Sequence, residues 1–441
     1  MARIRRKSSN LGADIRGDTS APAMSTMNEV SPIEPQAPKW DEVLKSQAAA
    51  PKPHTKRRKK SILRRFKDTC LKHTWLLPLL ILVVLLALYA VNPTESNPMH
   101  SAIFLSYPQP PKTPGGPIMY GKGPKDIAFV SFYIVVLSFT REFLMQRVIR
   151  PFAVYCGIRG RGKTARFMEQ VYTAMYFSIF GPFGLYVMSR SDLWYFNTTA
   201  MFEGFPHREH EGVFKAFYLL EASYWAQQAI VLLLMLEKPR KDFKELVAHH
   251  IITLALIGLS YRFHFAHMGI AVYITHDISD FFLATSKTFN YLELLITAPY
   301  FGFFVVMWIY LRHYLNLKIL WAVLTEFRTV GPFELNWETQ QYKCWISQYI
   351  TFALLASLQA VNLFWLFLIL RILKNYLFTN IKKDERSEDE DSEEEEVPAP
   401  DADDAQASLA TGIEKPTLNA RSKENQNPQV LLNGEPVRTR N

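Results

Sequence analysis

Ionisable side chains lie inside two segments that are otherwise apolar enough to cross a membrane. The first segment opens with His249 and His250, and the second carries His276, Asp277 and Asp280. An ionisable group at the centre of a bilayer costs about 2.5–3.5 kcal/mol on insertion scales, so such a cluster predicts a function. A histidine takes up a proton near neutral pH and a carboxylate orients its ring, so these residues suit general base catalysis.

The spacing of these residues places several of them on shared helix faces. Asp277 and Asp280 are three positions apart, and His276 and Asp280 are four apart, so each pair lies on one face of a helix. Adjacent histidines point about 100° apart, so we expect one of His249 and His250 to touch the reacting group. The other would orient the substrate or contact a carboxylate. A structural alternative, in which these side chains only pair across helices, stays open.

The elements that must position these residues are predicted membrane helices. The chain is 49% hydrophobic, yet its apolar residues gather in the middle, between polar ends. About 20 apolar residues are needed to cross a bilayer. The predicted spans cover 75–91, 126–144, 170–188, 213–236, 247–263, 268–286, 299–321 and 345–373. The fold class is therefore an all-α polytopic membrane protein with about eight transmembrane helices.

Charge predicts the orientation of the spans. Loop 145–168 is rich in arginine and lysine, and such loops face the cytosol. Segments 1–74, 237–246 and 287–298 and the C-terminal tail are then cytosolic, and loops 92–125, 189–212 and 322–344 are lumenal. His249 and His250 fall in the first turn of the fifth span. Asp280 lies about 10 Å and Asp277 about 15 Å from the cytosolic end of the sixth.

Four segments are expected along the chain. They are a disordered basic cytosolic arm (1–69), a first transmembrane helix with its lumenal loop (70–125), a catalytic membrane domain (126–375) and a disordered acidic cytosolic tail (376–441). The net charge of +9 reflects basic residues beside apolar spans, so no nucleic acid partner is predicted. Asn197 begins a glycosylation acceptor sequence in a loop placed on the lumenal side.

A metal site is one alternative reading of the histidines. HREH (207–210), HH (249–250) and HFAH (264–267) superficially resemble the histidine boxes of metal-dependent lipid hydroxylases and desaturases. In the predicted topology HREH and HFAH are lumenal while HH is cytosolic, so they do not share one metal centre. We therefore predict no metal and no permanently bound cofactor.

The region 194–291 resembles the ceramide synthases, and the TRAM–LAG1–CLN8 membrane domain more broadly. It carries FPH at 205–207, YWAQQ at 224–228, HH at 249–250, SY at 260–261, HDISD at 276–280 and KTFNY at 287–291. The resemblance covers roughly 125–375. The additional first span and the acidic tail are similar to those of fungal members.

This resemblance implies an acyl-CoA-dependent N-acyltransferase of the endoplasmic reticulum membrane. The amine of a sphingoid base (dihydrosphingosine or phytosphingosine) attacks a long- or very-long-chain acyl thioester to give a ceramide and CoA. The resemblance implies that His249, His250, Asp277 and Asp280 are catalytic. Expected substrate-binding residues are Ser260, Tyr261, His276, Lys287, Asn290, Tyr224, Gln227, Gln228, Arg240 and Lys241. A histidine either deprotonates the amine or is transiently acylated, and both routes stay open.

Further expectations concern partners, modification and mutants. The fungal resemblance implies a small single-span regulatory subunit and homo- or hetero-dimerisation with a paralogue. Ser8 and Ser9 follow arginines and Ser387 and Ser392 precede acidic runs, so these four are predicted phosphosites. A non-catalytic lipid-sensing membrane protein is the second alternative, since the wider domain family includes such members. We expect His249→Ala and Asp280→Ala each to abolish N-acylation without loss of folded protein.

Overall fold

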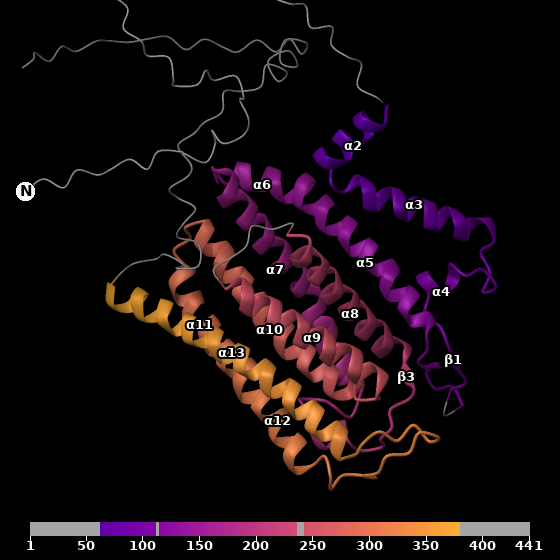
Figure 1. Ribbon diagram of the computed structural model, residues 1–441. Helices are drawn as coiled ribbons and strands as arrows, with labels where there is room; N and C mark the ends of the chain where they lie inside the picture. The colour runs from indigo at the N-terminus through magenta and orange to yellow at the C-terminus, as the bar shows by residue number, and fades with distance from the viewer. Residues whose placement is uncertain (1–61, 112–113, 236–241, 380–441) are drawn as a thin grey trace, which may run out of the picture. The chain divides into compact units, whose positions relative to one another are not determined.

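The computed structural model describes residues 62–111, 114–235 and 242–379. These residues are almost entirely helical (Figure 1). Most of the predicted arm and tail lies outside the described residues, and so do Ser8, Ser9, Arg240, Lys241, Ser387 and Ser392.

Each predicted span corresponds to helical structure. The long helices are α3 (Leu76–Val91), α5 (Lys125–Leu144), α7 (Arg161–Ser189), α8 (Gly212–Leu233), α9 (Phe243–Arg262), α10 (Ala266–Tyr291) and α13 (Trp345–Thr379). The seventh span is a continuous path of α11 (Thr297–Trp308), the π-helical η3 (Ile309–Leu315) and α12 (Asn316–Thr325). Shorter helices are α2 (Ile62–Lys72), α4 (His100–Ile103), η1 (Met145–Ile149), α6 (Arg150–Tyr155) and η2 (Thr199–Met201). The predicted all-α class is confirmed.

Helix α2 covers 62–69, a stretch for which no regular structure is predicted from the sequence. Apolar residues recur here at Ile62, Leu63 and Phe66 among arginines and lysines, which is the spacing of one helix face. The stretch 62–69 is therefore helical, and the boundary of the arm at residue 69 stays a prediction.

Length and hydropathy identify only some of the described helices as membrane spans. Four described helical stretches are long and apolar enough to cross a membrane: Lys125–Tyr155, Arg161–Ser189, Phe243–Arg262 and Trp345–Phe378. A fifth follows if Phe66–Lys72 and Leu76–Val91, bent by 107°, form one span. Helices α8 and α10 fall short because they bury polar side chains such as Glu221 and Asp277. Neighbouring helices shield such groups from lipid, so these helices tolerate them.

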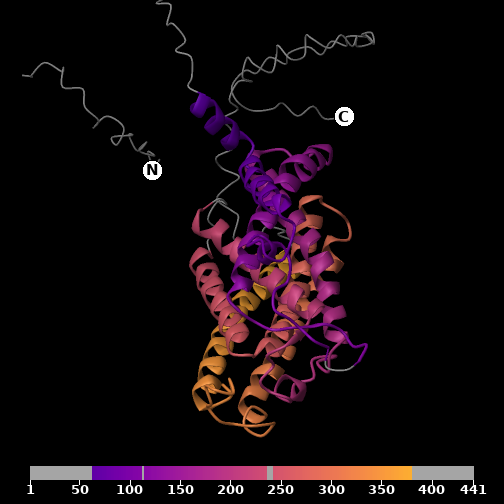
Figure 2. The ribbon, with the colours of Figure 1, turned by 90° about the vertical axis from the view of Figure 1, so that its right-hand side faces the viewer.

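Helix α10 lies inside the bundle, against α7 and in contact with α8, α9 and α11 (Figure 1). Seen from the side in Figure 2, the long helices of the bundle run along a common direction. The close approach of α7 and α10 requires glycine at position 184. A Cβ there would lie 2.8 Å from both Ile274 and Phe217, closer than packed carbon atoms allow. Packing at this crossing therefore fixes which face of α10 meets α7.

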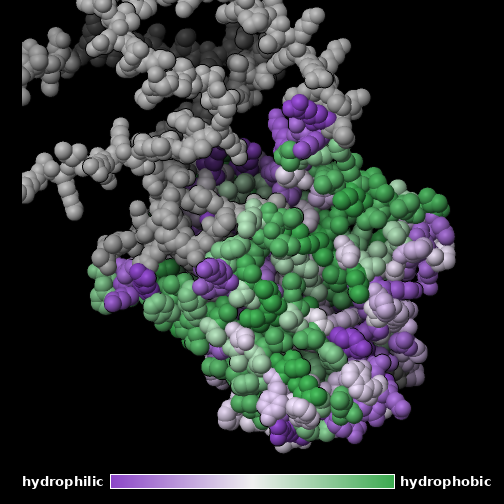
Figure 3. Space-filling model, in the orientation of Figure 1, coloured by the Kyte–Doolittle hydropathy of each residue, from purple (hydrophilic) through white to green (hydrophobic). Residues whose placement is uncertain are grey.

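The outer surface of the bundle is apolar over a wide area. Leu86, Ile127, Val306 and Phe367 are among many large apolar side chains that are exposed. Figure 3 shows a broad apolar face, with hydrophilic residues gathered toward its edges. An apolar surface of this extent is what a bilayer-facing protein presents.

A small antiparallel sheet closes the predicted lumenal end. Its strands are β1 (Pro108–Gln109), β2 (Met119–Tyr120) and β3 (His210–Glu211), in the order β1-β2-β3. Beside it the ammonium of Lys215 pairs with Asp126 at 2.7 Å, and both side chains are buried. The same ammonium donates to the carbonyl oxygens of Ser106 and Gly121. Because a buried charge needs such partners, this network ties the segment before α5 to α8.

Candidate active site

A cavity of about 230 Å³ lies between α8, α9, α10 and α13. Its wall is mostly apolar, with Leu256, Met268, Leu354 and Leu358 among the lining residues. It extends from His249 to residues at the predicted lumenal end, including Phe263, Phe265, Trp337 and Tyr342. His249 and Phe263 are about 20 Å apart along α9, roughly two-thirds of a bilayer's hydrocarbon thickness. The apolar lining and the length of this cavity suit a long hydrocarbon chain.

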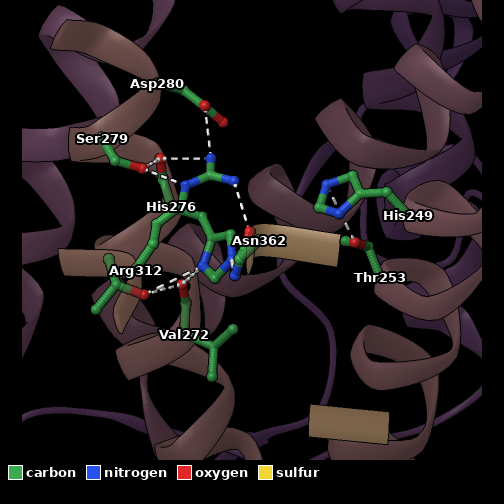
Figure 4. Close-up of polar contacts among 9 residues, drawn as sticks. His249, Thr253, Val272, His276, Ser279, Asp280, Arg312 and Asn362 are labelled. Carbon is green, nitrogen blue, oxygen red and sulfur yellow. Dashed lines mark hydrogen bonds and ion pairs between the residues drawn. The ribbon is translucent and has the colours of Figure 1, made fainter. Parts of the chain in front are cut away.

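His249 lies at one end of the cavity and is buried. Its ring centroid is 5.1 Å from that of Trp365, 5.7 Å from Trp225 and 6.4 Å from His276. Nε2 is 3.5 Å from the Thr253 hydroxyl (Figure 4), and Nδ1 has no hydrogen-bond partner among the described residues. Buried polar atoms are normally paired. The unpaired nitrogen on the cavity wall is therefore a candidate contact for a ligand.

His250 is turned away from the cavity. Its ring stands at 89° to that of His249, and its Nδ1 is 2.8 Å from the Leu246 carbonyl oxygen of the preceding turn. His249 is the histidine of this pair that lines the cavity. The roughly 100° offset of neighbouring helical residues accounts for the difference.

His276 is the second imidazole on the cavity wall, and both of its nitrogens have partners. Nδ1 lies 2.8 Å from the Val272 carbonyl oxygen and 3.1 Å from the Thr275 hydroxyl. Nε2 lies 3.2 Å from the side-chain nitrogen of Asn362 on α13 (Figure 4). His276 is thus held on two sides, whereas His249 is not.

Arg312 is one of the site residues that were not predicted from the sequence, along with Asn362, Glu221 and Trp365. It lies on η3, is buried, and its guanidinium donates to Ser279 at 2.6 Å and to Asn362 at 3.1 Å. It also forms an ion pair of 2.5 Å with Asp280. The sequence could have indicated it, because Arg312 lies inside the predicted apolar span 299–321. The cost of burying a charge in a membrane applies to this arginine as it does to the histidines and aspartates.

The two predicted catalytic aspartates point into different surroundings. Asp280 pairs with Arg312, as described above. Asp277 is completely buried within electrostatic range of Glu221 of α8, and neither of its oxygens has a hydrogen-bond partner within the described part of the chain. Glu221 accepts a hydrogen bond of 3.1 Å from Tyr176. The structure therefore groups His249 with His276, and Asp277 with Glu221.

The predicted substrate-binding residues are dispersed. Ser260 lines the cavity and is 2.5 Å from the Tyr218 hydroxyl. Tyr261 instead donates to Asp126 at 2.8 Å, near the predicted lumenal end. Tyr224 and Gln227 are buried away from the cavity lining, Gln228 and Lys287 are half-buried, and Asn290 is exposed. Asn197, the predicted glycosylation acceptor, is exposed.

The remaining histidine motifs meet at the predicted lumenal end. His207, His210 and His267 line a second cavity of about 660 Å³, and the His207 and His267 rings stack at 3.6 Å. Burial and then the nearby Lys122 lower the pKa of His264 to about 4, so this imidazole is neutral at physiological pH. HREH and HFAH are thus neighbours in the structure. Within the described ranges no group of three or more His, Cys, Asp or Glu side chains is arranged to hold a metal ion.

The helical bundle is that of an integral membrane protein, and its apolar cavity ends at a buried histidine. The TLC domain of the TRAM–LAG1–CLN8 family matches residues 166–371. A sphingosine N-acyltransferase-like protein of Gibberella moniliformis is 53% identical over 341 residues, 76% of this chain and 88% of the relative. A sphingosine N-acyltransferase of Schizosaccharomyces pombe is 53% identical over 339 residues, 76% and 87% of the two chains. A ceramide synthase of Saccharomyces cerevisiae is 48% identical over 395 residues, 88% and 93%.

These relatives extend well beyond the TLC domain and cover most of both chains. The chain therefore belongs to the ceramide synthase family, in its fungal branch.

Proposed function

We propose that this protein transfers an acyl group from acyl-CoA to the amine of a sphingoid base, giving a ceramide and CoA. The observation that carries the proposal is the apolar cavity with His249 at its end, in a chain of this family. The cavity takes the acyl chain, and the thioester carbonyl lies beside His249. The CoA headgroup stays at the cytosolic surface, because its charges are too costly to bury in the bilayer.

His249 acts on the reacting groups by one of two routes. In the direct route it takes a proton from the ammonium, and the neutral amine attacks the carbonyl. The C–S bond then breaks as the nitrogen gives up a second proton, so that one proton ends on the leaving thiolate and one is released to solvent. In the covalent route a ring nitrogen attacks first and releases CoA, and the amine then cleaves the acyl-imidazole. Trypsin cuts after Lys244 and Arg262, so His249 falls in the peptide 245–262. An acyl mass on this peptide after incubation with acyl-CoA alone supports the covalent route, and its absence during turnover contradicts it.

The proposed activity is tested with the full-length chain as the only synthase in cells that lack their own. Membranes from these cells receive an acyl-CoA and a sphingoid base, and ceramide and free CoA are measured together. We expect both products in equal amounts. Failure to form ceramide from any acyl-CoA, with folded protein present, would contradict the proposal. The ceramide species formed report the acyl length and the preferred base.

Asp277→Asn is expected to separate function from stability. An unpaired buried carboxylate opposes folding, so its replacement by an isosteric amide should leave the unfolding temperature unchanged or raise it. If Asp277 serves the reaction, N-acylation should fall at least about tenfold, equivalent to about 1.4 kcal/mol of activation free energy. Unfolding temperature and initial rate are measured on the same purified sample. Full activity would remove Asp277 from the site.

Leu354→Trp is expected to shift the ceramides toward shorter acyl chains. Leu354 lines the cavity on α13, and a larger ring there fills space that a long chain would occupy. Leu363→Trp on the same helix is the control, because Leu363 is 52% exposed on the bundle surface. Species profiles of the two variants are compared with wild type. An unchanged profile for Leu354→Trp would contradict the use of this cavity by the acyl chain.

The proposal includes residence in the endoplasmic reticulum membrane with both termini cytosolic. A small single-span subunit and a paralogous partner stay predictions, as do the four phosphosites. Affinity purification from the native host, with peptide mapping of the termini, tests these points together.

A further inference from the structure

Arg312 stands at the centre of a buried polar cluster that joins η3, α10 and α13. Its guanidinium donates to Asn362 and Ser279, lies 3.5 Å from the His276 carbonyl oxygen, and pairs with Asp280 (Figure 4). Among the described residues of this cluster, His276 is the one that lines the cavity, and Asn362 contacts its ring.

The direction of each hydrogen bond in the cluster follows from the fact that Arg312 can donate hydrogen bonds but cannot accept them. A guanidinium has donors and no acceptor, so the side-chain oxygen of Asn362 must face it. The amide nitrogen of Asn362 then faces His276 Nε2 at 3.2 Å. Because that nitrogen is a donor, Nε2 must accept and carries no proton.

The other nitrogen of His276 leads independently to the same tautomer. Nδ1 lies 2.8 Å from the Val272 carbonyl oxygen, which only accepts. It also lies 3.1 Å from the Thr275 hydroxyl, whose own proton goes to the same Val272 oxygen at 2.8 Å. Both partners therefore accept from Nδ1, and Nδ1 must carry the proton.

We propose that Arg312 and Asn362 are positioning residues that hold His276 as a neutral imidazole with its proton on Nδ1. Neither nitrogen of His276 is then available to the reacting groups. Of the two imidazoles on the described cavity wall, His249 is left to exchange a proton or accept an acyl group. A neutral His276, with its ring centroid 6.4 Å away, also adds no positive charge that would oppose a proton on His249.

The catalytic part of this inference rests on the proposed function, while the tautomer of His276 does not. A second amide on α13 gives a matched control. Gln359 accepts from Asn316 at 2.9 Å, and its amide nitrogen is 2.7 Å from His313 Nδ1. It is buried like Asn362, yet neither Gln359 nor His313 lines the cavity.

The tautomer is measured on the wild-type full-length protein in lipid nanodiscs. The sample carries ¹⁵N in its histidines and ¹³C in its valine carbonyls. The His276 signal is recognised by dipolar coupling to the Val272 carbonyl carbon, so no substitution is needed for assignment. We expect one protonated nitrogen, Nδ1, and a bare Nε2. A bare Nδ1, or protons on both nitrogens, would overturn the proposal.

Asn362→Asp and Gln359→Glu then make the same chemical change at the two sites. In Asn362→Asp a carboxylate oxygen faces Nε2 and accepts, so we expect Nε2 to gain a proton. We expect kcat to fall at least about tenfold, with the KM for each substrate within about twofold. Gln359→Glu should leave the His276 spectrum unchanged and kcat within about twofold of wild type.

The outcomes distinguish the inference from the proposed function. An unchanged His276 spectrum or an unchanged kcat in Asn362→Asp overturns the positioning role. An equal loss of kcat in Gln359→Glu also overturns it, because the effect would then be one of helix packing. A His276 spectrum as expected, combined with full activity of His249→Ala, instead contradicts the proposed role of His249.

Discussion

His249→Ala is expected to lower the rate of N-acylation roughly a hundredfold to ten-thousandfold, the range that a positioned general base supplies. The protein should stay folded, because His249 makes one long contact of 3.5 Å to Thr253 and its Nδ1 has no partner among the described residues. Loss of the ring removes packing against Trp365 and Trp225 and breaks no strong hydrogen bond. Ceramide formation and unfolding temperature are the two measurements.

His267→Ala is the matched control for this experiment. His267 also stacks against a neighbouring histidine, but it lines the second cavity at the predicted lumenal end. Its replacement should leave the rate within about twofold, since it lies outside the site. His249→Gln, which retains side-chain volume, tests whether any loss in the alanine variant comes from the vacated space. Near-normal activity in both His249 variants would contradict the assignment.

Arg312→Met and Asp280→Leu are each expected to destabilise the fold by up to about 3–5 kcal/mol, while the double variant should lose less than the sum of the two single variants. Arg312 is buried and the Asp280 side chain is 19% exposed, and removal of one partner leaves the other charge uncompensated. Removal of both leaves no uncompensated charge, although Ser279 and Asn362 still lose the hydrogen bonds that Arg312 donates. Reversible unfolding of the three variants and wild type in mixed micelles gives the coupling free energy directly.

This prediction changes one expectation drawn from the sequence. From the sequence, Asp280→Ala is expected to abolish activity while the protein stays folded. Because Asp280 pairs with Arg312, we now expect the same substitution also to lower the amount of folded protein. Arg190→Met is the comparison, because the Arg190–Glu211 pair is on the surface and its removal should change stability little. Single variants at 312 and 280 that are as stable as Arg190→Met would contradict a structural role for the ion pair.

The residues of the candidate site were predictable because an ionisable group in a membrane span costs free energy whichever helices pack against it. His249, His276, Asp277 and Asp280 stand out in this way from the sequence alone. The same cost applies to Arg312, an arginine inside the apolar span 299–321. Their roles were not predictable, since spacing along one helix says nothing about the facing helix. Asp280 shares a helix face with His276, yet its partner comes from η3.

The sequence by itself determined the helices, their order and the family, because apolar length, charge beside the spans and motif spacing are local properties. Only the tertiary structure decided which side chains meet. The rotation of α10 is set by contacts such as those of Gly184 with Ile274 and Phe217, and these involve residues far apart in the chain. That rotation places the His276 ring 6.4 Å from that of His249 and buries Asp277 completely. A rotation of α10 about its axis would change the partners of all its side chains without any change in sequence. The roles of these side chains therefore depend on how the helices pack.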